Sequence, residues 1–309
     1  MAFDYKTTLA YFRNDYVPFE QAKLSIGSSP VLYGLAVYSV FAANWNEEKQ
    51  QTFLYRLQDH YERLQNSARM MDFTPLEQVV SYDQFVQIAK DMVTKNNIRE
   101  DALIRVCLFI DEELAGTKIH GLKTSYSAYI YPMGEILPLS GAHLCVSSWQ
   151  RTADNAIPSR AKINGSYVNA SLMKNEALLN GYDDAISIDE HGHVAEGTVA
   201  NVFFVRRGKL ITPDSATDIL EGITRSSVLT LAEKLGIPTE QRSVDRSELY
   251  MMDEAFFCGS SARITPILSI DKRPIGNGKV GELTARLSEA YRNVQHNDDP
   301  DFASWLTTV

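Results

Sequence analysis

A stretch rich in proline and glycine constrains the fold of this chain most. Residues 131–141 contain two prolines and two glycines, which interrupt helices and strands and are common in linkers between domains. The chain has 309 residues, about the length of two ordinary domains. We therefore predict a small N-terminal domain over 1–130, an interdomain loop over 131–141 and a larger domain over 142–309.

Apolar periodicity predicts helices and strands in both parts. Between Gln50 and Met71, apolar residues recur at steps of three and four, which is typical of an amphipathic helix. The uniformly apolar run 102–110 predicts a buried strand. The other expected elements are a strand or strand-turn over 30–42, a helix carrying Phe85, Ile88, Ala89 and Met92, strands near 143–149, 185–189, 201–206 and 255–259, and helices near 165–180, 224–235 and 282–294. The predicted fold class is α+β or α/β.

Composition excludes several classes of partner. Thirty basic and 39 acidic residues give a net charge of −9, which argues against a surface for nucleic acid or an anionic membrane. No apolar run approaches the ~18 residues of a membrane span, and the N-terminus lacks the pattern of a secretory signal. The cysteines Cys107, Cys145 and Cys258 have no paired spacing, which favours a reducing compartment and no zinc module. We expect a cytoplasmic protein without a metal.

Four short patterns have simple structural explanations. Gly276–Gly281 has the spacing of a dinucleotide fingerprint, but too little chain follows for the required βαβ unit, so we expect a turn before the last helix. Ser159 and Lys162 form a Ser-x-x-Lys pattern without the companion motifs of acyl enzymes. His191-Gly-His193 is typical of a hairpin turn. Cys258 has no histidine brought to it by a motif, and we expect a buried thiol.

Four separated segments together carry a specific pattern. They are Arg160-Ala-Lys162-Ile-Asn-Gly165-Ser-Tyr167, Glu196-Gly-Thr-Val-Ala-Asn201-Val-Phe203, Leu220-Glu-Gly222-Ile-Thr-Arg225 and Phe257-Cys-Gly259-Ser260-Ser261-Ala262. In this order and with these gaps they resemble the class IV pyridoxal-phosphate aminotransferases. That group includes branched-chain and D-amino-acid aminotransferases and aminodeoxychorismate lyase. The resemblance extends from about Tyr33 to the final helix. It implies the two-domain fold type IV architecture (D-amino-acid aminotransferase-like) and a homodimer.

The resemblance implies which residues hold the cofactor, pyridoxal 5′-phosphate. Lys162 would form the internal aldimine and carry a proton between the substrate α-carbon and the cofactor, because a desolvated amine among positive charges is available in neutral form. Glu196 would face the ring nitrogen and keep it protonated, and Tyr167 would bond the ring's phenolic oxygen. The implied phosphate-binding groups are the helix-opening amides of Ile223 and Thr224, and Gly222, Ser260 and Arg56.

The resemblance also implies how substrates bind. Arg105 lies within an apolar strand, where a guanidinium needs an anionic partner. In branched-chain aminotransferases the matching arginine takes the side-chain carboxylate of glutamate or 2-oxoglutarate. The remaining implied contacts are Tyr33 and Tyr38 as pocket walls, and Ser260, Ser261 and Ala262 at the α-carboxylate. The implied activity is ping-pong transamination of branched-chain or other apolar L-amino acids with 2-oxoglutarate.

Two departures leave alternatives open. Branched-chain members usually read Tyr-Gly-x-x-Val-Phe-Glu-Gly, where this chain has Tyr38-Ser39-Val40, and the usual tyrosine two positions before the strand arginine is Leu103. The alternatives are a D-amino-acid or (R)-amine transaminase, or aminodeoxychorismate lyase. The arginine and histidine pattern that D-amino-acid aminotransferases use for the carboxylate is not found after Arg105, which favours the L-branched-chain interpretation.

Overall fold

The structure is a computed structural model that describes residues 2–309. They form two compact units. Unit 1 combines the residues up to Gly134 with Ala161–Ser166 and Asn293–Val309, and unit 2 combines Glu135–Arg160 with Tyr167–Arg292. Both 161–166 and 293–309 thus group with the N-terminal residues, although the sequence assigned them to the larger domain. The predicted domain boundaries stay a prediction.

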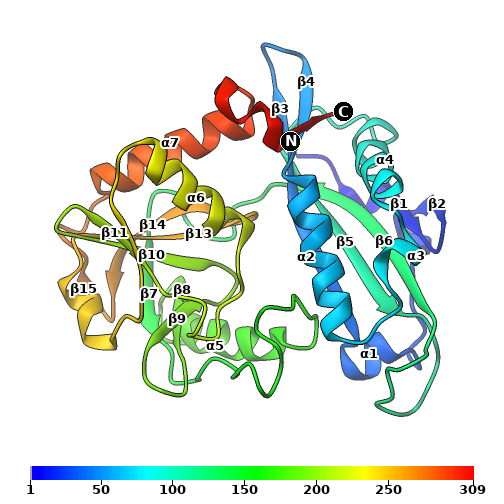
Figure 1. Cartoon of the computed structure of the whole chain (residues 1–309), viewed down its shortest axis with the longest axis horizontal. Helices are drawn as coiled ribbons and strands as arrows, with labels where there is room; N and C mark the ends of the chain where they lie inside the picture. The colour runs from blue at the N-terminus through cyan, green and yellow to red at the C-terminus, as the bar shows by residue number, and fades with distance from the viewer. Residues whose placement is uncertain (1) are drawn as a thin grey trace. The chain divides into compact units, whose positions relative to one another are not determined.

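Unit 1 is built on a seven-stranded antiparallel sheet in the order β16–β4–β3–β5–β6–β1–β2 (Figure 1). The strands are β1 (Leu9–Phe12), β2 (Asp15–Pro18), β3 (Ala36–Asn46), β4 (Gln51–Tyr55), β5 (Ala102–Ile110), β6 (Thr124–Pro132) and β16 (Leu306–Thr308). Val40 pairs with Arg105, and Arg105 pairs with Tyr129. Because paired residues in an antiparallel sheet point to the same face, these three side chains share one face of the sheet.

Helices pack on the sheet of unit 1, and the hydrophobic core of the unit lies between these helices and the sheet. The helices are α1 (Ser29–Tyr33), α2 (Leu57–Met70), α3 (Leu76–Val79) and α4 (Tyr82–Thr94), with 3-10 turns η1 (Tyr5–Thr7), η2 (Phe19–Gln21) and η4 (Pro300–Trp305). Figure 1 shows α2 running alongside β3, which it contacts. Phe41 on β3, Leu64 on α2 and Phe85 on α4 are fully buried. Each such side chain contributes about 1.5–3 kcal/mol through burial.

Unit 2 contains a mixed sheet in the order β12–β11–β10–β13–β14–β7–β8–β9, with β15 beside β14. The strands are β7 (Ala142–Val146), β8 (Asp184–Ile188), β9 (Val194–Gly197), β10 (Asn201–Arg206), β11 (Lys209–Thr212), β12 (Thr239–Gln241), β13 (Glu254–Gly259), β14 (Arg263–Ile270) and β15 (Arg273–Pro274). β7 pairs in parallel with β14 and β8, whereas β10, β13 and β14 pair antiparallel. The helices are α5 (Tyr167–Leu179), α6 (Ile223–Lys234) and α7 (Glu282–Gln295), with the 3-10 turn η3 (Arg246–Met251). Residues 293–295 at the end of α7 belong to unit 1.

The α+β prediction is confirmed, and one predicted helix begins later than expected. The strand over 102–110 coincides with β5, and that over 201–206 with β10. Residues Gln51–Tyr55, predicted as the start of a helix, instead form β4, and α2 begins only at Leu57. The strand forms because β4 pairs with β3 and β16 on either side, and this long-range pairing outweighs the local helical periodicity.

The simple explanations of the short patterns are confirmed where the structure tests them. Gly276 and Gly278 have positive φ in the turn segment before α7. His191-Gly-His193 lies in the turn between the antiparallel strands β8 and β9. Cys258 is 1% exposed, and burial raises the pKa of its thiol. Within residues 2–309, no group of three or more His, Cys, Asp or Glu side chains could hold a metal ion. No helix in this range is long and apolar enough to cross a membrane.

Candidate active site

Lys162 lies on a short segment that forms backbone hydrogen bonds with the first residues of β3 in unit 1. The Tyr38 amide donates to the Lys162 carbonyl over 3.0 Å, and the Asn164 amide donates to Ala36 over 2.8 Å. The Lys162 amide in turn donates to Oγ of Ser67 on α2, over 3.1 Å. Backbone bonds to a strand and a helix therefore fix the point from which the lysine side chain extends.

Two cations approach the ring of Tyr38. The Nζ atom of Lys162 lies 4.9 Å from the ring centroid, and Cζ of Arg105 lies 3.6 Å from it. Arg105 shares this face of the sheet with Tyr129. Burial raises the pKa of Tyr129, and the positive charge of Arg105 offsets part of this increase. The structure thus brings Lys162, Tyr38 and Arg105 together, as the predicted site requires. Tyr33 lies at the end of α1 and is 40% exposed.

A polar cluster that the sequence analysis missed lies between β3 and α2. His60 is 1% exposed, and its Nδ1 lies 2.8 Å from Oγ of Ser39. Burial lowers the pKa of His60, and the charges of Arg63, Arg56 and Lys162 lower it further. Arg63 donates from Nη2 to the same Ser39 oxygen over 3.0 Å. Because His60 is neutral, its Nδ1 can accept a hydrogen bond from the Ser39 hydroxyl. The oxygen of the same hydroxyl accepts from Arg63.

The two arginines of this helix region have different partners. Arg56, the predicted phosphate ligand, precedes α2 and bonds Asp59 twice, over 2.9 Å from Nε and 2.6 Å from Nη2. Its guanidinium also lies over the ring of Trp305. Arg63 contacts the neutral groups Ser39 and His60. The sequence signal that could have revealed this cluster is a polar stripe on one face of α2. It consists of His60, Arg63 and Ser67, which follow one another at steps of three and four.

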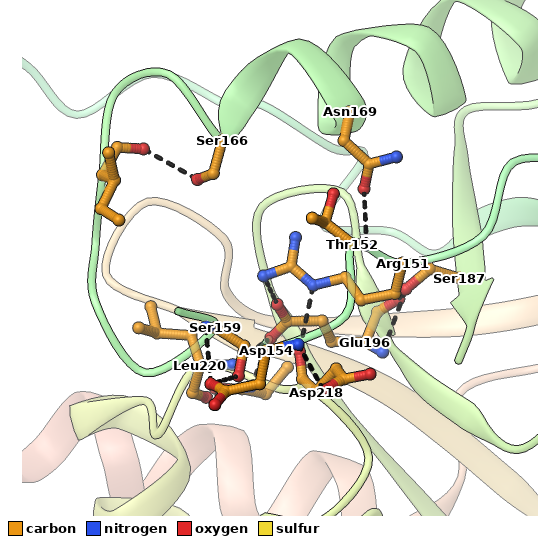
Figure 2. A network of polar contacts seen from close by, with 12 residues as sticks. Arg151, Thr152, Asp154, Ser159, Ser166, Asn169, Ser187, Glu196, Asp218 and Leu220 are labelled. Carbon is orange, nitrogen blue, oxygen red and sulfur yellow. Dashed lines mark hydrogen bonds and ion pairs between the residues drawn. The ribbon is translucent and has the colours of Figure 1, made fainter. Parts of the chain in front are cut away.

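Glu196 lies on β9 in unit 2 at the centre of a polar network (Figure 2). Its Oε1 forms an ion pair of 2.9 Å with Nη2 of Arg151. Its Oε2 accepts from Nδ2 of Asn201 over 2.8 Å and from the Leu220 amide over 3.2 Å. Its carbonyl accepts from Oγ of Ser187 over 2.7 Å. These donors hold the buried carboxylate in a defined orientation.

The start of α6 lies beside this network. Gly222 is the N-cap of α6 and has no side chain to cap the helix. A Cβ atom at this position would overlap Oδ1 of Asn201, so a larger residue would have to displace this side chain from its bonds to Glu196 and Leu220. Ile223 and Thr224 follow as the first helical residues, and both are buried. The first amides of a helix point outward along its axis and favour anions.

The remaining predicted residues lie at element ends of unit 2. Tyr167 is the first residue of α5. Ser260, Ser261 and Ala262 form the tight turn between β13 and β14, and Thr265 closes this turn by donating to the Ala262 carbonyl over 2.7 Å. The turn therefore presents two serine hydroxyls and backbone amides at the end of a strand pair.

A family model now gives the family. The model of the class IV amino-transferases matches residues 42–270. This chain belongs to the class IV aminotransferases. The match includes the segments that carry Lys162, Glu196 and Gly222.

Individual class IV aminotransferases resemble the chain over nearly its whole length. A probable branched-chain-amino-acid aminotransferase of Aquifex aeolicus is 41% identical over 97% of this chain and 96% of its own. The crystal structure of a branched-chain aminotransferase from Thermoproteus uzoniensis with norvaline has a TM-score of 0.92 at 35% identity, covering 97% of this chain and 99% of that one. The PLP form of the Thermobaculum terrenum branched-chain amino acid aminotransferase has a TM-score of 0.91 at 35% identity, covering 99% of both.

The residues of this class IV aminotransferase fit pyridoxal 5′-phosphate. The Lys162 amine can bind an aldehyde carbon, and the buried carboxylate of Glu196 can face a ring nitrogen. The start of α6, where Gly222 removes side-chain bulk, suits a phosphate. The donor set therefore has a chemical partner for each of the three reactive ends of the cofactor.

Proposed function

We propose that this class IV aminotransferase moves the amino group of branched-chain and similar apolar L-amino acids to 2-oxoglutarate, using pyridoxal 5′-phosphate. The observation that carries this proposal is the placement of Arg105 against Tyr38 on the sheet face that Lys162 approaches. A guanidinium stacked on an aromatic ring can bind the distal carboxylate of an acidic substrate. Val40 and Leu103 lie on the same sheet face and offer apolar contact to a branched side chain.

One group of residues would bind and polarise the cofactor. When bound, pyridoxal phosphate supplies an aldehyde carbon that links to amines and a ring that accepts electrons from the substrate α-carbon. Glu196 would hold a proton on the ring nitrogen, and Tyr167 would donate to the phenolic oxygen. The phosphate would be bound by the amides of Ile223 and Thr224, with Gly222 permitting close approach and Ser260 adding a hydroxyl donor.

A second group of residues would carry out the proton transfer and bind substrate. The Nζ atom of Lys162 would take the proton from the substrate α-carbon and hold it for return during the same turnover. For the phosphate, Arg63 is better suited than Arg56, because Asp59 already neutralises Arg56. Tyr33 and Tyr38 would line the side-chain pocket. Ser261 and Ala262 would bind the α-carboxylate.

The first experiment is the visible spectrum of the purified protein before and after an amino donor. A yellow band that L-leucine bleaches, and D-leucine does not, supports the proposal. Bleaching by D-leucine alone would assign the enzyme to D-amino acids. A yellow protein that neither donor changes would favour an amine transaminase or the lyase. A colourless protein that added pyridoxal phosphate cannot restore would contradict the cofactor assignment.

We also propose that the enzyme is a homodimer and acts in the cytoplasm. In unit 1, Ile26, Val31 and Leu32 are 46–87% exposed, and in unit 2, Val168 and Leu179 are 66% and 78% exposed. Exposed apolar groups of this kind favour burial against another subunit. Three free cysteines favour a reducing compartment. Sedimentation analysis of the full chain tests the oligomeric state, and a monomer at micromolar concentration would contradict the dimer.

A further inference from the structure

Arg151 contacts the carboxylate of Glu196, although the sequence pattern assigned it no role. The side chains of this ion pair are 12% and 8% exposed. Exposed ion pairs are screened by water, whereas shielding at this level strengthens the attraction. An arginine in direct contact favours the charged form of a carboxyl group, and so makes it a weaker base.

The backbone and side chain of Arg151 are both held in place. Its amide donates to the Ile188 carbonyl over 2.8 Å, and its Nε donates to the Asp218 carbonyl over 3.1 Å. Figure 2 shows the guanidinium in contact with both Glu196 and Asp218. The arginine therefore reaches Glu196 from a fixed position.

Other polar groups near Glu196 contribute less charge at its oxygens. Asn201 and the Leu220 amide are neutral donors. Arg225 is buried and bonds the Pro213 carbonyl and Gln241, so it acts on Glu196 from a greater distance. Burial raises the pKa of the Cys258 thiol, which leaves it neutral. Arg151 is thus a cation in direct contact with Glu196, and its loss would raise the basicity of this carboxylate.

We propose that Arg151 is a positioning residue that makes Glu196 a weaker base than the cofactor's ring nitrogen, so that their shared proton stays on the nitrogen. This inference rests on the proposed function. Without Arg151, the proton would move from the ring nitrogen to an Oε atom of Glu196, and no other bond would change. Electron acceptance by the ring depends on that proton.

The test uses the full-length protein loaded with pyridoxal 5′-phosphate that carries 15N in the ring. The 15N resonance distinguishes a protonated from an unprotonated ring nitrogen without any turnover. We expect the protonated position in the wild-type protein and a shift toward the unprotonated position in Arg151→Gln. Arg151→Lys keeps the charge and should keep the protonated position.

Further variants separate charge from folding. Arg160→Gln removes a more exposed arginine, which pairs with Asp154 and Glu221, and should leave the resonance unchanged. In a Glu196→Gln background, adding Arg151→Gln should cause no further shift, because the base it acts on is gone. Circular dichroism of each variant checks folding.

The outcomes separate the two proposals. A wild-type protein that does not retain the labelled cofactor after dialysis would overturn the proposed function. A wild-type protein that retains it with an unprotonated ring nitrogen would overturn only the role of Arg151. The same holds if Arg151→Gln leaves the resonance in place, or if Arg151→Lys shifts it as far as the glutamine variant does.

Discussion

The guanidinium of Arg105 is stacked on the ring of Tyr38, with Cζ 3.6 Å from the ring centroid. The two residues are not direct pairing partners, because Tyr38 lies opposite Cys107 and Arg105 lies opposite Val40. They are diagonal neighbours on one sheet face, within reach of long side chains. The aromatic ring therefore holds the guanidinium in a defined place on this face, where a distal carboxylate can meet it.

Loss of Arg105 should affect acidic substrates more than apolar ones. A hydrogen bond to a charged group contributes about 1.5–3 kcal/mol, so Arg105→Ala should raise the KM for 2-oxoglutarate about 10- to 100-fold. The KM for 4-methyl-2-oxopentanoate should change much less. Steady-state kinetics with both acceptors measures this. Arg13→Ala, which removes an exposed arginine paired with Asp111, is the control, and equal losses for both acceptors would refute the role of Arg105.

Lys162→Ala should abolish transamination and the visible band while the protein stays folded. The backbone bonds that hold the segment, from Tyr38 and to Ser67, do not use the lysine side chain. We therefore expect a thermal transition within a few degrees of wild type. Absorption spectra and activity assays check the first part, and circular dichroism checks the second. Transamination at a rate near wild type would disprove the assignment of Lys162.

Substitution of the two arginines near the start of α2 should change the affinity for the cofactor to different extents. Arg63→Gln should weaken binding of pyridoxal phosphate to the apoprotein about tenfold or more, because it removes a charged donor. Arg56→Gln should change affinity little, since Arg56 is paired with Asp59. Fluorescence titration of both apoproteins with the cofactor measures the difference. A larger loss of cofactor affinity in Arg56→Gln than in Arg63→Gln would instead support Arg56 as the phosphate-binding arginine, as the sequence predicted.

His60 should make stability fall in mild acid. Its pKa in the folded protein is lower than the ordinary value of 6.5, so below pH 6.5 the unfolded chain binds more protons than the folded one. Stability is then complete above pH 6.5 and decreases as the pH falls, by up to about 1.4 kcal/mol at pH 5.5 from this residue.

Urea unfolding at pH 7.5 and 5.5 tests this contribution. His60→Gln should reduce the difference in unfolding free energy between the two pH values. His120→Gln, at an exposed histidine paired with Asp72, should leave the difference unchanged. An unchanged difference in His60→Gln would mean that other groups cause the acid sensitivity.

Gly222→Ala should damage both folding and cofactor binding. The new methyl group would overlap Oδ1 of Asn201, and overpacking of this kind costs about 1–3 kcal/mol. Since Asn201 also donates to Glu196, the change should disturb the carboxylate as well. Thermal unfolding and cofactor titration measure the two effects. Gly116→Ala, which meets nothing within 4 Å, is the matched control.

Local patterns predicted the elements that lie within one continuous stretch of sequence. The strand β5 and the helices α5, α6 and α7 were predicted within one or two residues, because apolar periodicity and end signals are local. The strand β4 was not, because pairing with β3 and β16 decides its conformation. Both partners lie at other places in the chain.

The polar partners of the site were predicted less well than its main residues. Lys162 and Glu196 are part of a motif that spans four segments, so their grouping was visible in the sequence. Arg151 and His60 act through contacts that form only on folding, with Glu196 and Ser39 respectively. A single arginine or histidine on an otherwise ordinary segment carries no sign of such a partner.

The six residues Ala161–Ser166 belong to unit 1, while the chain on either side of them belongs to unit 2. Neither unit is therefore a continuous piece of the gene. A split of the coding sequence near residue 134 would leave Lys162 on the fragment that lacks its backbone partner Tyr38, and Asn164 without its partner Ala36. Attempts to express the halves separately, or to exchange them between relatives, would have to transplant this hexapeptide and the C-terminal Asn293–Val309 together with the N-terminal part.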